Sequence, residues 1–131
     1  MRRLPYPGGS TSPDASPFWV TIEIGGLGDR FSAPVQALVD TESTYTWIPR
    51  DILEALDITP DDDQLFEHTD GRSVRYPIAW VRLRLAERVQ HTLVVFAPAG
   101  SELVLGSLTL ACFGLAADPP HEALISVPGR L

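Results

Sequence analysis

Apolar residues that recur at every second position are the feature that most constrains this chain. The first run consists of Phe18, Val20, Ile22 and Ile24, which alternate with Trp19, Thr21 and Glu23. The second run, after turn residues 25–29, places on one face Phe31, Ala33, Val35, Ala37 and Val39. A period of two is typical of strands with one buried face, so the pattern predicts a β-hairpin that leads directly into Asp40.

A second hairpin is predicted at Asp70-Gly71, because both central positions of a type I′ turn need positive φ and Asp-Gly is a strong signal for such a turn. The strand that follows is apolar at even positions up to Trp80 and at odd positions from Val81 onward. A continuous strand changes parity only through a bulge, a bend or a change of the surface on which it packs. Pro77 lacks an N–H and predicts an edge or unpaired backbone beside this change.

Helix signals occur twice. Pro49 can occupy a first helical turn, and it is followed before Pro60 by one apolar face made of Ile52, Leu53 and Leu56. Near the C-terminus, Ser107 is expected to cap a short helix with an apolar stripe of Leu108, Ala111, Cys112 and Leu115. Cys112 is accordingly interpreted as a small core residue.

Length and composition predict one domain. A chain of 131 residues that is 44% hydrophobic can bury a single core. Residues 1–16 are rich in Pro, Gly, Ser and Thr and cannot supply a buried face, so they are predicted as a flexible N-terminal arm before one domain over 17–131. The net charge of −7 argues against nucleic acid as a partner, because phosphates require a basic surface.

Neither a membrane nor a cofactor is expected. The sequence has no signal-peptide pattern and no apolar stretch long enough to cross a bilayer. The single cysteine, Cys112, excludes an internal disulfide and suits the reducing cytoplasm, where the protein is expected. The three histidines lack ligand spacing and the acidic run 61–63 is interpreted as a solvated loop, so no metal site is predicted.

Chemistry is expected in residues 38–43, which read Leu-Val-Asp-Thr-Glu-Ser. An aspartate that ends a buried strand and begins a turn is unfavourable unless its oxygens accept hydrogen bonds, and the hydroxyl residues after Asp40 supply donors. This segment resembles the Asp-Thr-Gly-Ser/Ala loop of retropepsin-like aspartic proteases, the single-lobe, retroviral-type family that also has a prokaryotic type. The family's second motif, two apolar residues and a glycine that open a short helix, is matched by Leu103-Val104-Leu105-Gly106.

The resemblance extends over residues 18–127, with Asp70-Gly71 at the place of the family's flap. It implies a mainly β fold, half of an acid-protease-like closed β-barrel with one or two short helices, that assembles as a two-fold homodimer. The reaction needs two carboxylates that activate a water, so each copy would contribute Asp40. Thr41 would lock the two loops together, Ser43 would support the loop, and the flap would close over a peptide or protein substrate.

Glu42 departs from the family motif, which has glycine there so that the backbone can approach the carboxylates and the substrate. Glutamate adds bulk and a charge that two-fold symmetry doubles, and like charges at close range raise the shared pKa values. Two interpretations remain. Either Glu42 turns aside and leaves a slow or strongly acid-dependent protease, or the site is inactive and the dimer serves as a module that binds peptides or proteins.

Three functions of different classes are therefore compatible with the sequence. The first is a homodimeric aspartic endopeptidase, and the second is a catalytically inactive dimer of the same fold. The third is an unrelated small β-barrel that binds a ligand, in which Asp40 is an ordinary turn residue. The endopeptidase is the function that we predict, because the strand, the Asp-Thr loop, the hairpin tip and the Leu-Gly helix occur in the family's order.

Overall fold

The computed structural model describes residues 17–26 and 28–128, and the predicted arm 1–16 lies outside the described residues. The fold is mainly β with two short helices, as predicted. In chain order the elements are β1 (Phe18–Gly25), β2 (Val35–Val39), β3 (Thr46–Pro49), α1 (Arg50–Ala55), β4 (Asp62–Glu67), β5 (Ser73–Leu85), β6 (Arg88–Ala97), β7 (Val104–Leu105), α2 (Ser107–Cys112), β8 (Leu115–Asp118), a 3₁₀ turn (Pro119–His121) and β9 (Ala123–Ser126).

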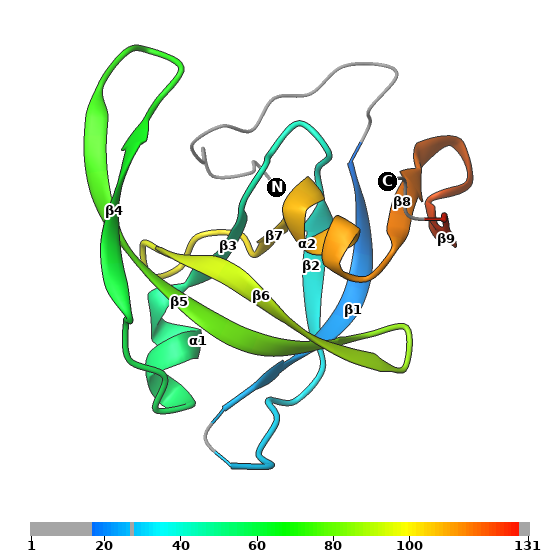
Figure 1. The fold of residues 1–131 in the computed structure, drawn as a ribbon, viewed down its shortest axis with the longest axis horizontal. Coiled ribbons are helices and arrows are strands. Elements are labelled where there is room, and N and C mark those ends of the chain that lie inside the picture. Colours follow the sequence, from blue (N-terminus) through cyan, green and yellow to red (C-terminus); the bar gives the residue numbers. More distant parts are fainter. Residues whose placement is uncertain (1–16, 27, 129–131) are drawn as a thin grey trace.

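The main sheet closes on itself. Its seven strands are ordered β1-β2-β7-β3-β6-β5-β4, and the C-terminal end of β1 also pairs with β5, with Glu23 opposite Arg84. Six strands therefore form a ring, and β4 extends β5 outside it, where the β4–β5 hairpin projects from the rest of the fold (Figure 1). Large side chains fill the main core, among them Phe18, Ile22, Ile24, Leu83, Leu105 and Phe113.

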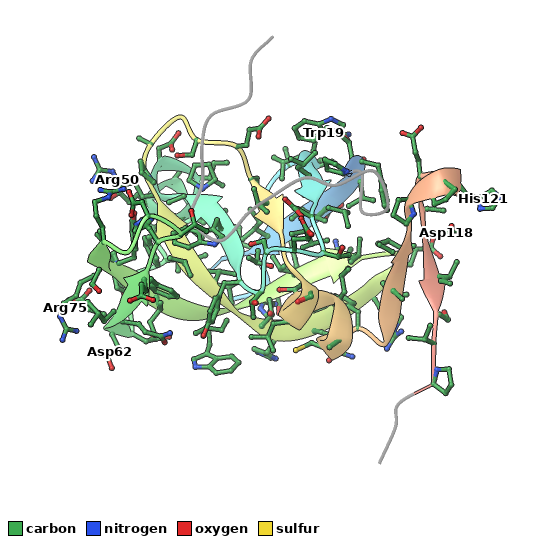
Figure 2. All side chains as sticks on the ribbon, turned by 90° about the horizontal axis from the view of Figure 1, so that it is seen from above. Trp19, Arg50, Asp62, Arg75, Asp118 and His121 are labelled. Atoms are coloured by element: carbon green, nitrogen blue, oxygen red, sulfur yellow. The ribbon has the colours of Figure 1, made fainter. Side chains whose placement is uncertain are left out.

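A separate two-stranded sheet, β8–β9, lies on the side of the molecule opposite the β4–β5 hairpin (Figure 1). One face of it packs on the main core through Leu115, Ala117 and Leu124. Charged side chains gather at both ends of the fold in the view from above: Arg75 and Asp62 project near β4, and Asp118 and His121 near β8 (Figure 2). This second sheet was not predicted from the sequence.

The first predicted hairpin is present, but its second strand is shorter than predicted. Trp19 is 51% exposed, while its apolar neighbours in β1 alternate with it and face the core. β2 begins only at Val35, Ala33 is exposed, and Phe31 makes an isolated bridge to the end of β1. Pro34 explains the interruption, because a residue without an N–H cannot continue the ladder.

Both predicted helices are present, but the buried face of the second was predicted wrongly. In α1, Leu53 is fully buried, as predicted, whereas Pro49 is not within the first helical turn but ends β3 as the N-cap of the helix. In α2 the N-cap is Gly106 without a side-chain cap, Leu108 is 39% exposed and Cys112 is exposed. The helix instead buries Thr109 and Leu110, because the Thr109 hydroxyl finds hydrogen-bond partners inside the protein.

The hairpin tip at Asp70-Gly71 is confirmed, but its turn type is not. Only Gly71 has positive φ there, at 88°, and the tip is closed by the His68 N–H, which donates to the Arg72 carbonyl at 2.7 Å. The Asp70 carboxylate accepts the Arg72 N–H at 3.0 Å, a local turn that leaves Asp70 at negative φ. The turn with positive φ at both central positions joins β5 to β6 at residues 86–87.

The apolar residues of β5 change from even to odd positions because the strand packs on two different surfaces. It runs for 13 residues, and its register with β4 and β6 contains no bulge. Its even residues Tyr76 and Ile78 pack on a small aromatic cluster, and its odd residues from Ala79 onward face the main core. Trp80, which the pattern grouped with the even apolar face, is 63% exposed. Pro77 pairs with β4 alone, because the β5–β6 ladder begins at Ile78, so the predicted edge is confirmed.

Candidate active site

The loop that carries Asp40 crosses the end of the central strand β7. This strand pairs in parallel with β2 and antiparallel with β3, and residues 40–45 connect those two neighbours. At the crossing, the Asp40 N–H donates to the carbonyl of Leu105 at 3.1 Å. The two motifs of the sequence, at Asp40 and at Leu105-Gly106, are therefore direct neighbours in the structure.

The Asp40 side chain is enclosed within its own chain, and 0% of the residue is exposed. Its carboxylate oxygen Oδ1 accepts the main-chain N–H of Glu42 at 3.1 Å, and its main-chain carbonyl accepts the N–H of Ser43 at 3.1 Å. A buried carboxylate needs such donors, because it has lost its hydration. The loop thus forms a tight turn around the carboxylate.

The other loop residues divide between the surface and the interior. Thr41 and Glu42 are exposed, whereas Ser43 is 1% exposed and its Oγ donates to the carbonyl of Tyr45 at 2.9 Å. Ser43 therefore holds the turn from inside. Glu42 is not one of the described residues that have a positive φ. Its main chain therefore adopts a conformation that does not require glycine.

Gly106 is required at its position because two segments of backbone approach it closely. A Cβ placed on Gly106 would lie 2.3 Å from the carbonyl oxygen of Tyr45 and 2.8 Å from that of Ser43. The first amides of α2 then donate to the loop, from Ser107 to the Ser43 carbonyl at 2.8 Å and from Leu108 to the Thr44 carbonyl at 3.0 Å. The second motif is thus the surface on which the Asp40 loop rests.

Three buried threonines behind the loop were not identified from the sequence. Thr46 begins β3, Thr92 lies in β6 and Thr109 lies in α2, and each is 0% exposed. Their hydroxyl oxygens are linked in a row, Thr46 to Thr109 at 2.5 Å and Thr109 to Thr92 at 2.8 Å. The signal available in the sequence was one hydroxyl residue within each of three apolar segments.

An aromatic cluster joins the β4–β5 hairpin to β3, close to the end of the Asp40 loop. The ring of Phe66 lies 5.1 Å from that of Tyr45 and 5.5 Å from that of Trp47, and the Trp47 ring lies 5.0 Å from that of Tyr76. Trp47 and Phe66 are buried, at 2% and 8% exposure. The hairpin is therefore packed as far as Phe66, near the end of β4, whereas a Cβ added to Gly71 at the tip would have nothing within 4 Å.

The tip of this hairpin is held by an ion pair. The Arg72 Nε donates to Asp70 Oδ2 at 2.8 Å, in addition to the main-chain bond described above. The Arg72 N–H and then its guanidinium lower the pKa of the Asp70 carboxyl from its ordinary value of 3.8, and the carboxylate raises the pKa of Arg72. Both side chains are largely exposed to solvent.

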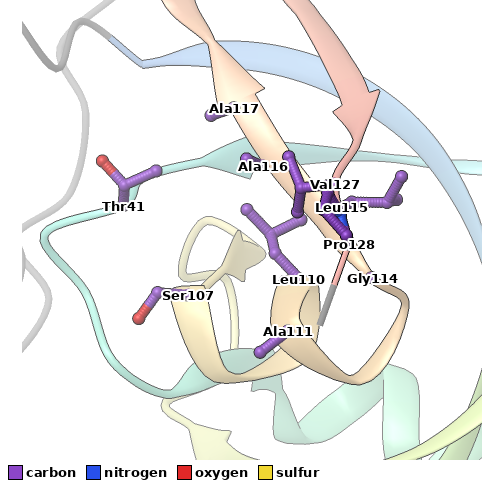
Figure 3. A pocket seen from close by; sticks show the side chains of 10 residues that line it. All are labelled: Thr41, Ser107, Leu110, Ala111, Gly114, Leu115, Ala116, Ala117, Val127 and Pro128. Carbon is purple, nitrogen blue, oxygen red and sulfur yellow. The ribbon is translucent and has the colours of Figure 1, made fainter. Parts of the chain in front are cut away.

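An apolar groove of about 430 Å³ adjoins the Asp40 loop (Figure 3). It lies between α2 and the β8–β9 sheet, with Thr41 at one rim and Val127 and Leu115 at the other. The exposed residues Leu108 and Ile125, at 39% and 46%, add apolar surface on the elements that border it.

Among the residues that the structure describes, no helix is long and apolar enough to span a membrane.

The sheet forms a ring, and the loop with the buried aspartate crosses a central strand and rests on a glycine before a short helix. This arrangement is the one expected of retropepsin-like aspartic proteases. Comparison with known proteins agrees. The family model for aspartyl proteases matches residues 20–109, and the chain therefore belongs to this family.

One solved structure with a similar fold is the solution structure of the simian foamy virus (mac) protease. The TM-score is 0.53 and the sequence identity is 19% over 71% of this chain and 91% of that chain. No curated protein matches the sequence.

Proposed function

We propose that the protein is a homodimeric aspartic endopeptidase that hydrolyses peptide bonds with a water activated between two Asp40 carboxylates. The observation that carries the proposal is the Asp40 turn, whose carboxylate accepts the Glu42 N–H and whose main chain is seated on Leu105-Gly106, in a chain of the aspartyl protease family. One carboxylate acts as base toward the water and the other as acid, so two are required. Asp-Thr occurs once in the sequence, and the second Asp40 therefore comes from another copy.

The groove beside the Asp40 loop supports a second copy of the chain as the partner. Thr41 is exposed at its rim, which suits a residue that bonds its symmetry mate. A two-fold axis close to Asp40 brings the apolar lining of the groove against the same surface of the other copy and removes it from water. The single cysteine, Cys112, suits the reducing cytoplasm, which we propose as the location of the protein.

The β4–β5 hairpin is proposed as the flap. The aromatic cluster fixes its strands as far as Phe66 and Tyr76, whereas its tip around Asp70 and Gly71 projects beyond other described elements (Figure 1). A substrate in extended conformation would pass between this tip and Asp40, and closure of the tip would exclude water from the reaction.

A catalytically inactive dimer that binds peptides or proteins is the second candidate, and the glutamate at position 42 is the observation that favours it. Two symmetric Glu42 carboxylates add negative charge close to the Asp40 pair, and like charges at close range repel one another. Glu42 is nevertheless exposed and has an ordinary main-chain conformation, so it does not distort the turn that holds Asp40. We therefore propose an active enzyme that works best at acid pH.

The experiment is cleavage of a mixed peptide library from acid to neutral pH, with and without pepstatin. The expected result is pepstatin-sensitive cleavage that increases as the pH falls and is lost in Asp40→Asn, because an amide cannot take a proton from water. The matched control is Asp29→Asn, which removes an exposed carboxylate from the turn between β1 and β2, at the opposite end of β2 from Asp40. Dimerisation without cleavage under every condition would favour the inactive binding module.

A further inference from the structure

The three buried threonines form a continuous polar path through an otherwise apolar interior. Thr92 of β6, Thr109 of α2 and Thr46 of β3 are linked oxygen to oxygen, and each is 0% exposed. A hydroxyl both donates and accepts, so the row can be satisfied with its protons pointing in either direction. The row ends at the main chain, because the Gly106 N–H donates to Thr46 Oγ1 at 3.0 Å.

The peptide group between Leu105 and Gly106 connects this row to Asp40. Its carbonyl accepts the Asp40 N–H at 3.1 Å, and its N–H is the donor to Thr46. The carbonyl and the N–H of a trans peptide point in opposite directions, so this rigid plane is held on one side by Asp40 and on the other by a threonine. A rotation of the plane that lengthens one of these bonds also disturbs the other.

We propose that Thr46, supported by Thr109 and Thr92, is a positioning residue for Asp40. The hydroxyl row fixes the plane of the Leu105–Gly106 peptide, and that peptide fixes the main chain from which the Asp40 carboxylate projects. This inference rests on the proposed protease function. Threonine hydroxyls do not titrate in the range where carboxylates do, so the support is unchanged while the Asp40 pair gains and loses protons.

The position of each hydroxyl in the row provides the test. Thr→Val at any of the three sites removes at least one hydrogen bond from a buried hydroxyl or amide, so all three changes lower stability. Among the hydrogen bonds of the described residues, that of Thr46 links the row to the Leu105–Gly106 peptide, and two hydroxyl-to-hydroxyl bonds separate Thr92 from Thr46. If the threonine row is purely structural, each variant should lose activity in proportion to its loss of stability. If the row positions Asp40, the loss of activity should be largest for the Thr46 variant, smaller for Thr109 and smallest for Thr92.

The experiment measures kcat, KM and the exchange rates of the Asp40 and Gly106 amides in Thr46→Val, Thr46→Ser and Thr92→Val, under conditions where all remain folded. In Thr46→Val we expect kcat to fall about tenfold, the effect of one buried hydrogen bond, with little change in KM. We also expect faster amide exchange at both positions. Thr46→Ser should restore kcat to within about twofold of the parent, and Thr92→Val should lower it by about twofold.

Two results would overturn the inference. One is an equal loss of kcat in Thr46→Val and Thr92→Val when their stabilities are equal. The other is unchanged exchange of the Asp40 amide in Thr46→Val. The exchange measurement does not depend on catalysis, so it decides the positioning role even if the parent cleaves no peptide, a result that would contradict the proposed function instead.

Discussion

Replacement of Gly106 by alanine tests the structural basis of the site most severely. Gly106 has φ −92° and ψ 172°, an extended conformation that any residue adopts, so only space requires glycine here. The added Cβ would lie 2.3 Å from the Tyr45 carbonyl oxygen, whereas ordinary contact begins at 3.4 Å. The two backbones must therefore separate by 3.4 − 2.3 = 1.1 Å at this point.

The expected loss of stability follows from that displacement. Overpacking costs about 1 to 3 kcal/mol, and the shift also breaks or lengthens the bonds from the Ser107 and Leu108 amides to the loop, at about 1 kcal/mol each. Gly106→Ala should thus lower the free energy of unfolding by about 3 to 5 kcal/mol, a large part of the 5 to 15 kcal/mol typical of a domain. Peptide cleavage should be lost, because the Asp40 turn rests on this glycine.

The assay is urea unfolding of Gly106→Ala beside Gly100→Ala. Gly100 has φ +81° and nothing within 4 Å of an added Cβ, so its replacement introduces backbone strain without a clash and should cost only about 1 to 2 kcal/mol. An unfolding midpoint for Gly106→Ala equal to that of the parent would refute the packing of the loop on Gly106.

Three further predictions concern the rim of the site and the flap. Glu42→Gly should raise cleavage at neutral pH several-fold and tighten the dimer by removing like charges beside Asp40; equal activity in parent and variant across pH would contradict this. Phe66→Ala should lower the free energy of unfolding by about 3 kcal/mol in urea unfolding, whereas Leu65→Ala, at a position 55% exposed, should change it little; equal losses would be inconsistent with the aromatic cluster. The lowered pKa of Asp70 means that its contact with Arg72 orders the hairpin tip above pH 3.8 and is lost as the pH falls through the folded-state value. An NMR titration of Asp70 should give a midpoint below 3.8, and a midpoint at or above that value would exclude the contact.

Sequence patterns predicted those parts of the fold that local periodicity determines. The alternation in 18–39 located the first strand and the buried end of the second, and Pro49 marked the start of α1. The match of Leu105-Gly106 to a family motif identified the right segment. Its physical reason, the contact with the Tyr45 carbonyl, depends on two segments about 60 residues apart and has no local signal.

The errors arose where long-range partners override local preference. An apolar stripe through Cys112 was the best local choice for the buried face of α2, yet Thr109 is inside because Thr46 and Thr92, 63 and 17 residues away, bind its hydroxyl. Residues 86–87 form the tightest hairpin turn without glycine or asparagine, so turn chemistry gave no warning. The change from even to odd apolar positions in β5 was recognised in the sequence. Its cause, a change of packing surface and not a bulge or a bend, depends on two separate clusters that no local pattern reveals.

The most direct test of the central claim is a mixing experiment, in which the parent chain at constant concentration is titrated with the Asp40→Asn chain and peptide cleavage is measured after subunits have exchanged. If each active site takes one Asp40 from each copy, parent chains captured in mixed dimers are inactive. Equal amounts should then reduce the activity to about half, and a large excess of the variant should abolish it. Activity that stays constant at every ratio, while native mass spectrometry with an isotopically labelled Asp40→Asn chain shows mixed dimers, would contradict the claim.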